Sequence, residues 1–116
     1  MAFKRFVQAV VLTVSLAVSL AAAALPATAD PLRIVGLGDS LMAGYGLAPG
    51  EAFPDRLQAA LIARGHDVVI ENAGVSGDTS SGGLSRLDWS VPDGTDIVIL
   101  ELGANDMLRG IEPAIT

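Results

Sequence analysis

The sequence predicts an α/β protein built around a parallel sheet. Three short apolar segments, at residues 32–37, 68–70 and 97–102, are partly β-branched and are bounded by Gly, Asp or Asn, which is typical of strands. Segments with helical patterns separate them, and this alternation favours parallel strands joined by right-handed crossovers. The third apolar segment shows no alternation of apolar and polar residues, so we expect a parallel strand that is covered on both faces.

The segment before the first strand has the composition of a secretory signal peptide. Lys4 and Arg5 form a positive amino-terminal region, residues 7–25 are mainly apolar, and Ala27–Ala29 follows the Ala-x-Ala cleavage pattern. The apolar stretch also approaches the length of a membrane-spanning helix, so a retained anchor is the alternative. Pro26 and the small residues after it favour cleavage.

We therefore expect a signal peptide over residues 1–29 and a domain over residues 30–116, with no stable membrane anchoring after cleavage. The domain has five basic and 13 acidic residues, a net charge of −8, which disfavours nucleic acid as a partner. The sequence has no cysteine and a single histidine, so we expect no metal site of the Cys/His type. Nothing in the sequence implies a cofactor. An exported protein without disulfides suits a bacterial periplasmic or secreted location.

Residues 51–65, between the first two strands, predict an amphipathic helix. Phe53, Leu57 and Leu61 recur at four-residue spacing, which places them on one helix face. Pro54 suits the first helical turn, and the glycine that ends the segment suits the position after the last turn.

A second, shorter helix is expected over residues 80–87, before the third strand. Thr79 or Ser80 supplies its cap. Gly82 and Gly83 weaken the prediction, because each costs about 1 kcal/mol in a helix.

Ser40 follows the first strand directly, at the end of the sheet where α/β proteins usually bind ligands. A serine there is a candidate nucleophile, and the alternative is a serine that caps the next turn. Two common motifs do not match. Gly36-x-Gly38 lacks the last glycine of a dinucleotide-binding fingerprint, and Met42 stands where a G-x-S-x-G nucleophile elbow has glycine.

Three sequence blocks occur in order, each close behind an expected strand. They are "GDSL" at residues 38–41, "NAGVSGDTSSGGLSRLDW" at residues 72–89 and "LGANDM" at residues 102–107. Together they resemble the GDSL, or SGNH, serine hydrolases, and the second block is similar to the thioesterase I/lysophospholipase L1 and arylesterase branch. This resemblance implies a flavodoxin-like, three-layer α/β/α domain, of which this chain is the amino-terminal portion.

The resemblance also implies the roles of three residues in ester hydrolysis, which needs a nucleophile and donors for the oxyanion. Ser40 is the implied nucleophile, and its backbone N–H is one donor. Gly74 offers a second backbone N–H, and the Asn105 side-chain amide offers a third. The alternatives are that Gly74 is a turn glycine and Asn105 a helix N-cap. Asp39 and Asp106 are expected to be structural and to accept loop N–H bonds.

The catalytic base is missing from this sequence. The family uses a histidine in an Asp-x-x-His block near its carboxyl end, and the chain has no such block. Its histidine, His66, precedes the second strand, so we expect it at the other end of the sheet, roughly 17–20 Å from Ser40. A general base acts within hydrogen-bond reach, so His66 is expected to be a surface residue.

The sequence thus predicts a secreted serine esterase or thioesterase, of arylesterase, acyl-CoA thioesterase or lysophospholipase type, acting on small-molecule esters or thioesters. We expect this chain to be inactive alone because it lacks a base. The alternatives are a truncated, non-catalytic ester-binding protein, or an exported α/β binding protein in which the serine occurs by chance.

Overall fold

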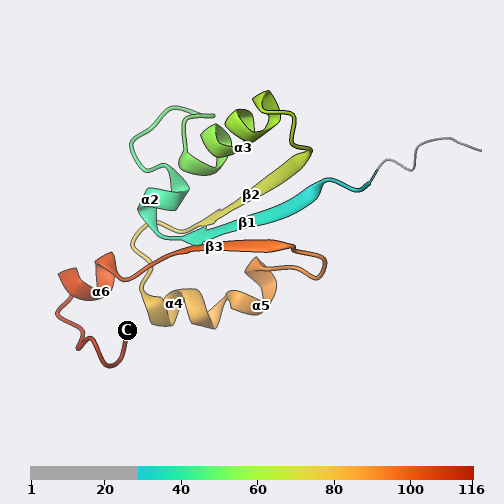
Figure 1. Cartoon of the computed structure of the whole chain (residues 1–116). Helices are drawn as coiled ribbons and strands as arrows, with labels where there is room; N and C mark the ends of the chain where they lie inside the picture. Colours follow the sequence, from blue (N-terminus) through green and yellow to red (C-terminus); the bar gives the residue numbers. More distant parts are fainter. Residues whose placement is uncertain (1–28) are drawn as a thin grey trace, which may run out of the picture.

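The computed structural model describes residues 29–116, and Figure 1 shows them as a parallel sheet with helices on both faces. The strands are β1 (Leu32–Gly38), β2 (Val68–Gly74) and β3 (Ile97–Glu101), in the spatial order β2-β1-β3. Both pairings with β1 are parallel, which confirms the predicted sheet. The predicted signal peptide lies outside the described residues apart from Ala29. Within residues 29–116 no helix has the length and apolar character needed to span a bilayer.

The helices form the two outer layers of the domain. They are α2 (Ser40–Ala43), α3 (Phe53–Ala63), α4 (Ser80–Ser85), α5 (Leu87–Ser90) and α6 (Ala104–Leu108). Figure 1 shows α2 and α3 on one face of the sheet and α4 and α5 on the other, with α6 beyond the end of β3. This is the expected three-layer α/β/α arrangement.

The central strand β1 holds most of the core. Ile34, Val35 and Leu37 are between 2 and 5 % exposed, because β1 has a neighbour on each side and helices above and below. Side chains alternate between the two faces of a strand. A Cβ added at Gly36 or Gly38 would meet Met42 of α2, so these positions face α2, and the intervening Leu37 faces α4.

Helix α3 begins and ends as predicted. Pro54 lies in its first turn, and Gly65, with φ of +86°, follows its end. The apolar face of α3 is more exposed than the four-residue spacing of its apolar residues predicted. Leu57 and Leu61 are half-buried, and Phe53 is 49 % exposed.

The helix predicted over residues 80–87 is confirmed at its start but is not continuous, because the segment forms two short helices, α4 and α5, that meet at Arg86. The Arg86 backbone leaves helical geometry, with φ of −113° and ψ of 7°, and its guanidinium turns inward to bond the strand ends. The predicted cap is confirmed, since Thr79 Oγ1 accepts the backbone N–H of Gly82 at 3.1 Å.

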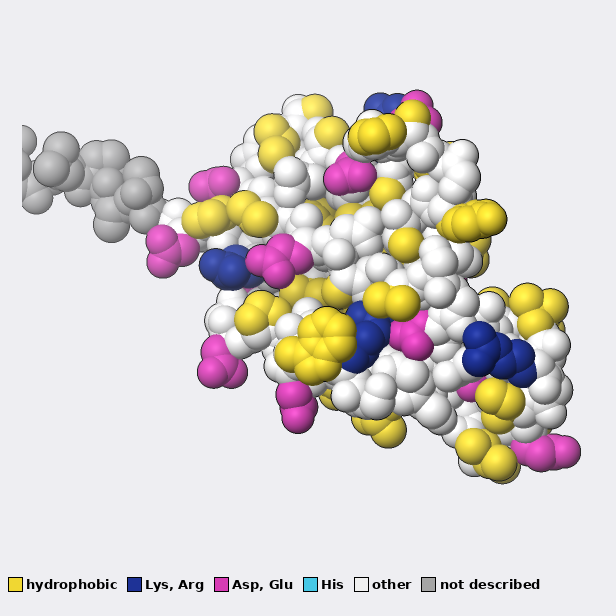
Figure 2. All heavy atoms as spheres, turned by 180° about the vertical axis from the view of Figure 1, so that it is seen from behind, with side chains coloured by type: hydrophobic (Ala, Val, Ile, Leu, Met, Phe, Trp, Pro, Cys, Tyr) yellow, Lys and Arg dark blue, Asp and Glu magenta, His cyan; other side chains and the backbone are white. Residues whose placement is uncertain are grey.

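The prediction that β3 is covered on both faces is also wrong for the described residues. Ile97 and Val98 are each 44 % exposed, and Leu100 is 67 % exposed. Within residues 29–116, β3 pairs only with β1, so its other edge and much of its surface meet solvent. Figure 2 shows, for one face of the molecule, hydrophobic side chains lying on the surface among charged ones.

Helix α2 packs unusually close to the end of β2, and Gly74 makes this possible. A Cβ at Gly74 would lie 2.6 Å from the Cα of Ala43 and 2.8 Å from the carbonyl carbon of Met42. Both are backbone atoms, which cannot rotate away. The glycine therefore leaves room for the α2 backbone.

We predict that Gly74→Ala destabilises the fold by about 1–3 kcal/mol, because the new methyl group forces α2 off the sheet. Gly36→Ala is the matched control, since its Cβ would meet the flexible Met42 Sδ at 2.6 Å and so costs less. Urea unfolding of the two variants measures the difference. Equal destabilisation would contradict the close packing of α2 on β2.

Candidate active site

The three parallel strands end at the same level, and this brings the predicted site residues to one end of the sheet. Gly38 of β1 lies opposite Gly74 of β2 and opposite Glu101 of β3. Ser40 and Asn105 lie within four residues beyond these strand ends. The structure thus gathers at one rim all three residues that the resemblance implied.

Ser40 is the first residue of α2, and Asp39 fixes the turn that presents it. Asp39 is 1 % exposed, and its Oδ1 accepts the backbone N–H of Leu41 at 3.0 Å. The backbone N–H of Asp39 donates to Glu101 Oε2 at 3.2 Å. The cap of α2 is therefore Asp39, so the alternative in which Ser40 caps the turn is wrong.

Asn105 connects the Ser40 turn to the loop after β2. Its Nδ2 donates to Asp39 Oδ2 at 3.0 Å and to the backbone oxygen of Asp78 at 2.8 Å. The residue before α6 is Gly103, with φ of +116°, so Asn105 lies inside the first turn and is not its N-cap. The side-chain amide is thereby held between the two segments that carry Ser40 and Asp78.

In the loop after β2, the glycine placed to offer a free N–H is Gly77, a role that the sequence did not indicate. The N–H of Gly74 donates to Asn72 Oδ1 at 2.9 Å. Among the described residues, the backbone N–H groups of Ser40 and Gly77 have no acceptor. Gly77 has φ of +82°, a conformation that favours glycine. The sequence signal was present in Gly77-Asp78-Thr79, but nothing in a pattern shows which N–H is already bonded.

Asp106 is structural, as predicted. It is 1 % exposed, and its carboxylate accepts the Ser80 backbone N–H at 2.8 Å and the Ser80 hydroxyl at 2.6 Å. The hydroxyl bond is the main cause that lowers the pKa of Asp106 from its ordinary value of 3.8. These bonds tie the start of α4 to α6, and so hold Asn105 over the loop.

Glu101 has the opposite shift. Burial, opposed by the N–H bond from Asp39 and reinforced by the nearby Asp39 carboxylate, raises the pKa of Glu101 above its ordinary value of 4.5. Its carboxylate accepts the Asp39 N–H and so helps to hold the turn before Ser40.

His66 lies at the other end of the sheet, as predicted. It is exposed, and the residue after it, Asp67, accepts the N–H of Leu32 at the start of β1. Seven residues of β1 then lead to Gly38, a rise of roughly 20 Å. The single histidine of the sequence is therefore too far away to take a proton from Ser40.

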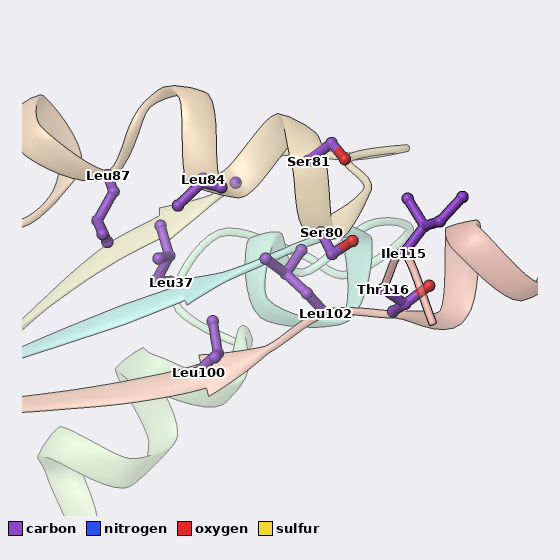
Figure 3. Close-up of a pocket in the computed structure, with 10 residues that line it drawn as sticks. Leu37, Ser80, Ser81, Leu84, Leu87, Leu100, Leu102, Ile115 and Thr116 are labelled. Carbon is purple, nitrogen blue, oxygen red and sulfur yellow. The ribbon is translucent and has the colours of Figure 1, made fainter. Parts of the chain in front are cut away.

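An apolar cavity of about 340 Å³ lies between α4, α5 and the sheet, separate from the Ser40 rim (Figure 3). Its walls are mainly leucines, and Ser80 and Thr116 line a more polar part. None of Ser40, Gly77 and Asn105 lines it. Residues 29–116 hold no group of three His, Asp or Glu side chains placed to bind a metal ion.

The segment that forms this rim also matches a known protein family. The model of the GDSL-like lipase/acylhydrolase family matches residues 37–116. The chain belongs to this family. The matched segment contains Ser40, Gly77 and Asn105, so the whole candidate site lies within the region that defines the family.

Individual GDSL-family proteins agree in sequence and fold. The arylesterase of Vibrio mimicus is 44 % identical over 84 residues, which cover 72 % of this chain and 42 % of that protein. Thioesterase 1/protease 1/lysophospholipase L1 of Escherichia coli K12 is 42 % identical over 91 residues, covering 78 % of this chain and 41 % of that protein.

The crystal structure of AlinE4, an SGNH-hydrolase family esterase, superposes with a TM-score of 0.71 at 46 % identity, over 77 % of this chain and 49 % of that one. This confirms the SGNH-hydrolase fold. The chain spans less than half the length of each of these three relatives.

The raised pKa of Glu101 predicts how stability depends on pH. The folded state binds this proton more tightly than the unfolded state, so the contribution of Glu101 to stability is full below pH 4.5 and is lost as the pH rises through the folded-state pKa. Glu101→Gln keeps an oxygen for the Asp39 N–H and removes the charge. We expect the variant to gain stability over the parent chain between pH 4.5 and 7.

Urea unfolding at several pH values measures this gain, with Glu112→Gln as the control because Glu112 is exposed. A variant whose loss of stability grows as the pH rises would show that the Glu101 charge is favourable where it stands.

Proposed function

We propose that the protein carrying this chain is a serine hydrolase of carboxylic esters or thioesters, with Ser40 as its nucleophile. The observation that carries the proposal is the Asn105 side chain. Its amide bonds both Asp39, next to Ser40, and Asp78, next to Gly77. These bonds link the segments that carry Ser40, Gly77 and Asn105 at one end of the sheet, which supports a shared site.

In this proposal Ser40 Oγ attacks the carbonyl carbon of the ester, and its proton passes to a base. The carbonyl oxygen becomes an oxyanion, which needs donors aimed at its new position. The unpaired N–H of Ser40 supplies one donor. Attack splits the ester into an acyl-enzyme and an alcohol or thiol, and water then releases the acid.

We assign the second donor to Gly77 rather than to Gly74. The Gly77 N–H has no acceptor within the described residues, whereas the Gly74 N–H is bonded to Asn72. Asn105 joins as the third donor by redirecting one N–H. We propose that the N–H now bonded to the Asp78 carbonyl turns to the oxyanion. The other N–H stays on the Asp39 carboxylate, because that bond is charge-assisted and therefore stronger.

The substrates we propose are small esters or thioesters, of the aryl ester, acyl thioester or lysophospholipid kind. The names of the matched proteins, an arylesterase and a thioesterase/lysophospholipase, support this range. We also propose that the protein is exported to the periplasm or beyond, on the signal-peptide pattern of residues 1–29. An acidic domain disfavours nucleic acid as a partner.

We propose further that this chain turns esters over negligibly when alone. Ser40 has no imidazole within reach, because the only histidine lies at the far end of the sheet. An oxyanion hole without a base retains a small fraction of the catalytic effect. Reaction of Ser40 with an activated phosphonate, whose fluoride leaves readily, is therefore a better test than turnover.

We predict that a fluorophosphonate attaches to Ser40 slowly and with one-to-one stoichiometry, and that Ser40→Ala abolishes the attachment. Asn105→Ala lowers the rate by about 100- to 1,000-fold, the usual effect of losing one oxyanion donor. Intact-mass spectrometry follows the reaction, and peptide mapping locates the adduct. Ser81→Ala is the matched control, since Ser81 is an exposed serine of α4.

The amide resonances of the labelled chain separate the two glycines. The Gly77 N–H moves downfield when it bonds the phosphonyl oxygen, and the Gly74 N–H stays in place. A shift at Gly74 alone would reverse the assignment of the second donor. Attachment that survives Ser40→Ala would refute the proposed function.

A further inference from the structure

The guanidinium of Arg86 lies buried beneath the candidate site, where the ends of β1 and β2 meet the loop that follows β2. Arg86 is 6 % exposed. Its Nε donates to Asp78 Oδ2 at 2.7 Å, in an ion pair whose side chains are 8 % and 13 % exposed. One terminal nitrogen donates to the Ala73 carbonyl at 2.8 Å and to Ser90 Oγ at 3.1 Å, and the other donates to the Gly38 carbonyl at 3.0 Å.

These bonds reach both segments that carry the unpaired N–H groups. Gly38 is two residues before Ser40, and Asp78 is the residue after Gly77. Gly38 O also accepts the backbone N–H of Val75 at 2.9 Å, so the two segments share one acceptor. The planar guanidinium is thus a rigid spacer between the Ser40 turn and the Gly77 loop.

We propose that Arg86 is a positioning residue that sets the distance and angle between the backbone N–H groups of Ser40 and Gly77. This inference rests on the proposed function, because it assigns those two groups to one oxyanion. Arg86 does not touch the substrate. Its effect comes through the Gly38 carbonyl on one side and the Asp78 carboxylate on the other.

The competing explanation is that Arg86 only neutralises the buried charge of Asp78. The two explanations differ in what lysine can do. A lysine ammonium is a point charge and still pairs with Asp78, but it lacks the fixed fork that reaches several acceptors in one plane. If only charge matters, Arg86→Lys behaves like the parent chain. If the spacing of the acceptors matters, Arg86→Lys differs from the parent chain.

The test uses the full chain and two variants. Arg86→Lys keeps the charge. The double variant Arg86→Met with Asp78→Asn removes both charges together, so that no unpaired ion is left buried if the single variant fails to fold. Arg56→Lys is the matched control, because Arg56 pairs with Glu51 on the exposed surface of α3.

Two measurements are made on each protein. The first is the rate at which a fluorophosphonate attaches to Ser40. The second is the orientation of the Ser40 and Gly77 N–H bonds, from residual dipolar couplings in weakly aligned samples, with the couplings of β1 and α3 as the internal reference. The second measurement needs no reaction.

We expect Arg86→Lys and the double variant to attach the phosphonate about 10- to 100-fold more slowly than the parent, a typical effect of misplacing a group by about 1 Å. We also expect the couplings of Ser40 and Gly77 to change while those of β1 and α3 hold. Arg56→Lys changes neither measurement. Unchanged rates and couplings in both Arg86 variants would overturn the inference and leave the proposed function intact.

Failure of the proposed function gives a different result from failure of the Arg86 inference. If the parent chain takes no phosphonate at Ser40, the proposed function fails. The couplings then still decide whether Arg86 sets the spacing of the two N–H groups. Couplings of Ser40 and Gly77 that change only in the Arg86 variants support that spacing role. Couplings that stay the same in every variant refute it.

Discussion

The buried carboxylate of Asp39 joins three segments that are distant in sequence, and the candidate site depends on that junction. One oxygen accepts the N–H of Leu41 and starts α2 at Ser40. The other accepts the amide of Asn105 from α6, and the Asp39 backbone N–H meets Glu101 of β3. A buried carboxylate that loses one of these partners pays its desolvation cost without compensation. The network therefore holds the Ser40 turn, β3 and α6 together.

Charge around this junction is mainly negative, and Arg86 offsets part of it. The carboxylates of Asp39, Asp78, Glu101 and Asp106 gather at the end of the sheet, and within the described residues Arg86 is the buried cation among them. The two resolved pKa shifts follow from local bonding. Asp106 receives two donors from Ser80 and stays ionised more easily, whereas Glu101 is partly buried beside another carboxylate and holds its proton longer.

Packing sets a second constraint, because the chain is more closely packed at the Ser40 rim than on the face of the sheet that α4 and α5 cover. Gly74 lets the α2 backbone lie directly on the end of β2, so the turn with Ser40 has little freedom. On the opposite face the leucine-lined cavity and the unpaired edge of β3 are open to solvent. An apolar parallel edge of this kind is prone to association with other strands. The Ser40 end of the domain is therefore closely packed, and much of the β3 surface is incompletely covered within the described residues.

The sequence was sufficient for the class of fold and for most of the site. Strand composition and helix spacing predicted the parallel sheet, because these patterns depend on local burial and turn chemistry. The three blocks located Ser40 and Asn105, which follow strand ends on one rim of the sheet. The position of His66 before the second strand placed it at the opposite end, because all the strands run in the same direction. The break of the helix at Arg86 did not follow from its sequence, since it depends on acceptors contributed by β1 and β2.

The packing role of Gly74, and our proposal of Gly77 as a donor, depend on the tertiary structure. A glycine in a sequence shows that a Cβ is absent, but not which atoms would meet it. In the same way, a pattern gives the position of an N–H group, but not whether another residue already accepts its hydrogen. Both questions concern contacts between segments brought together by the sheet, so the sequence by itself determined where the site is, and the tertiary structure determined which groups in it are free to act.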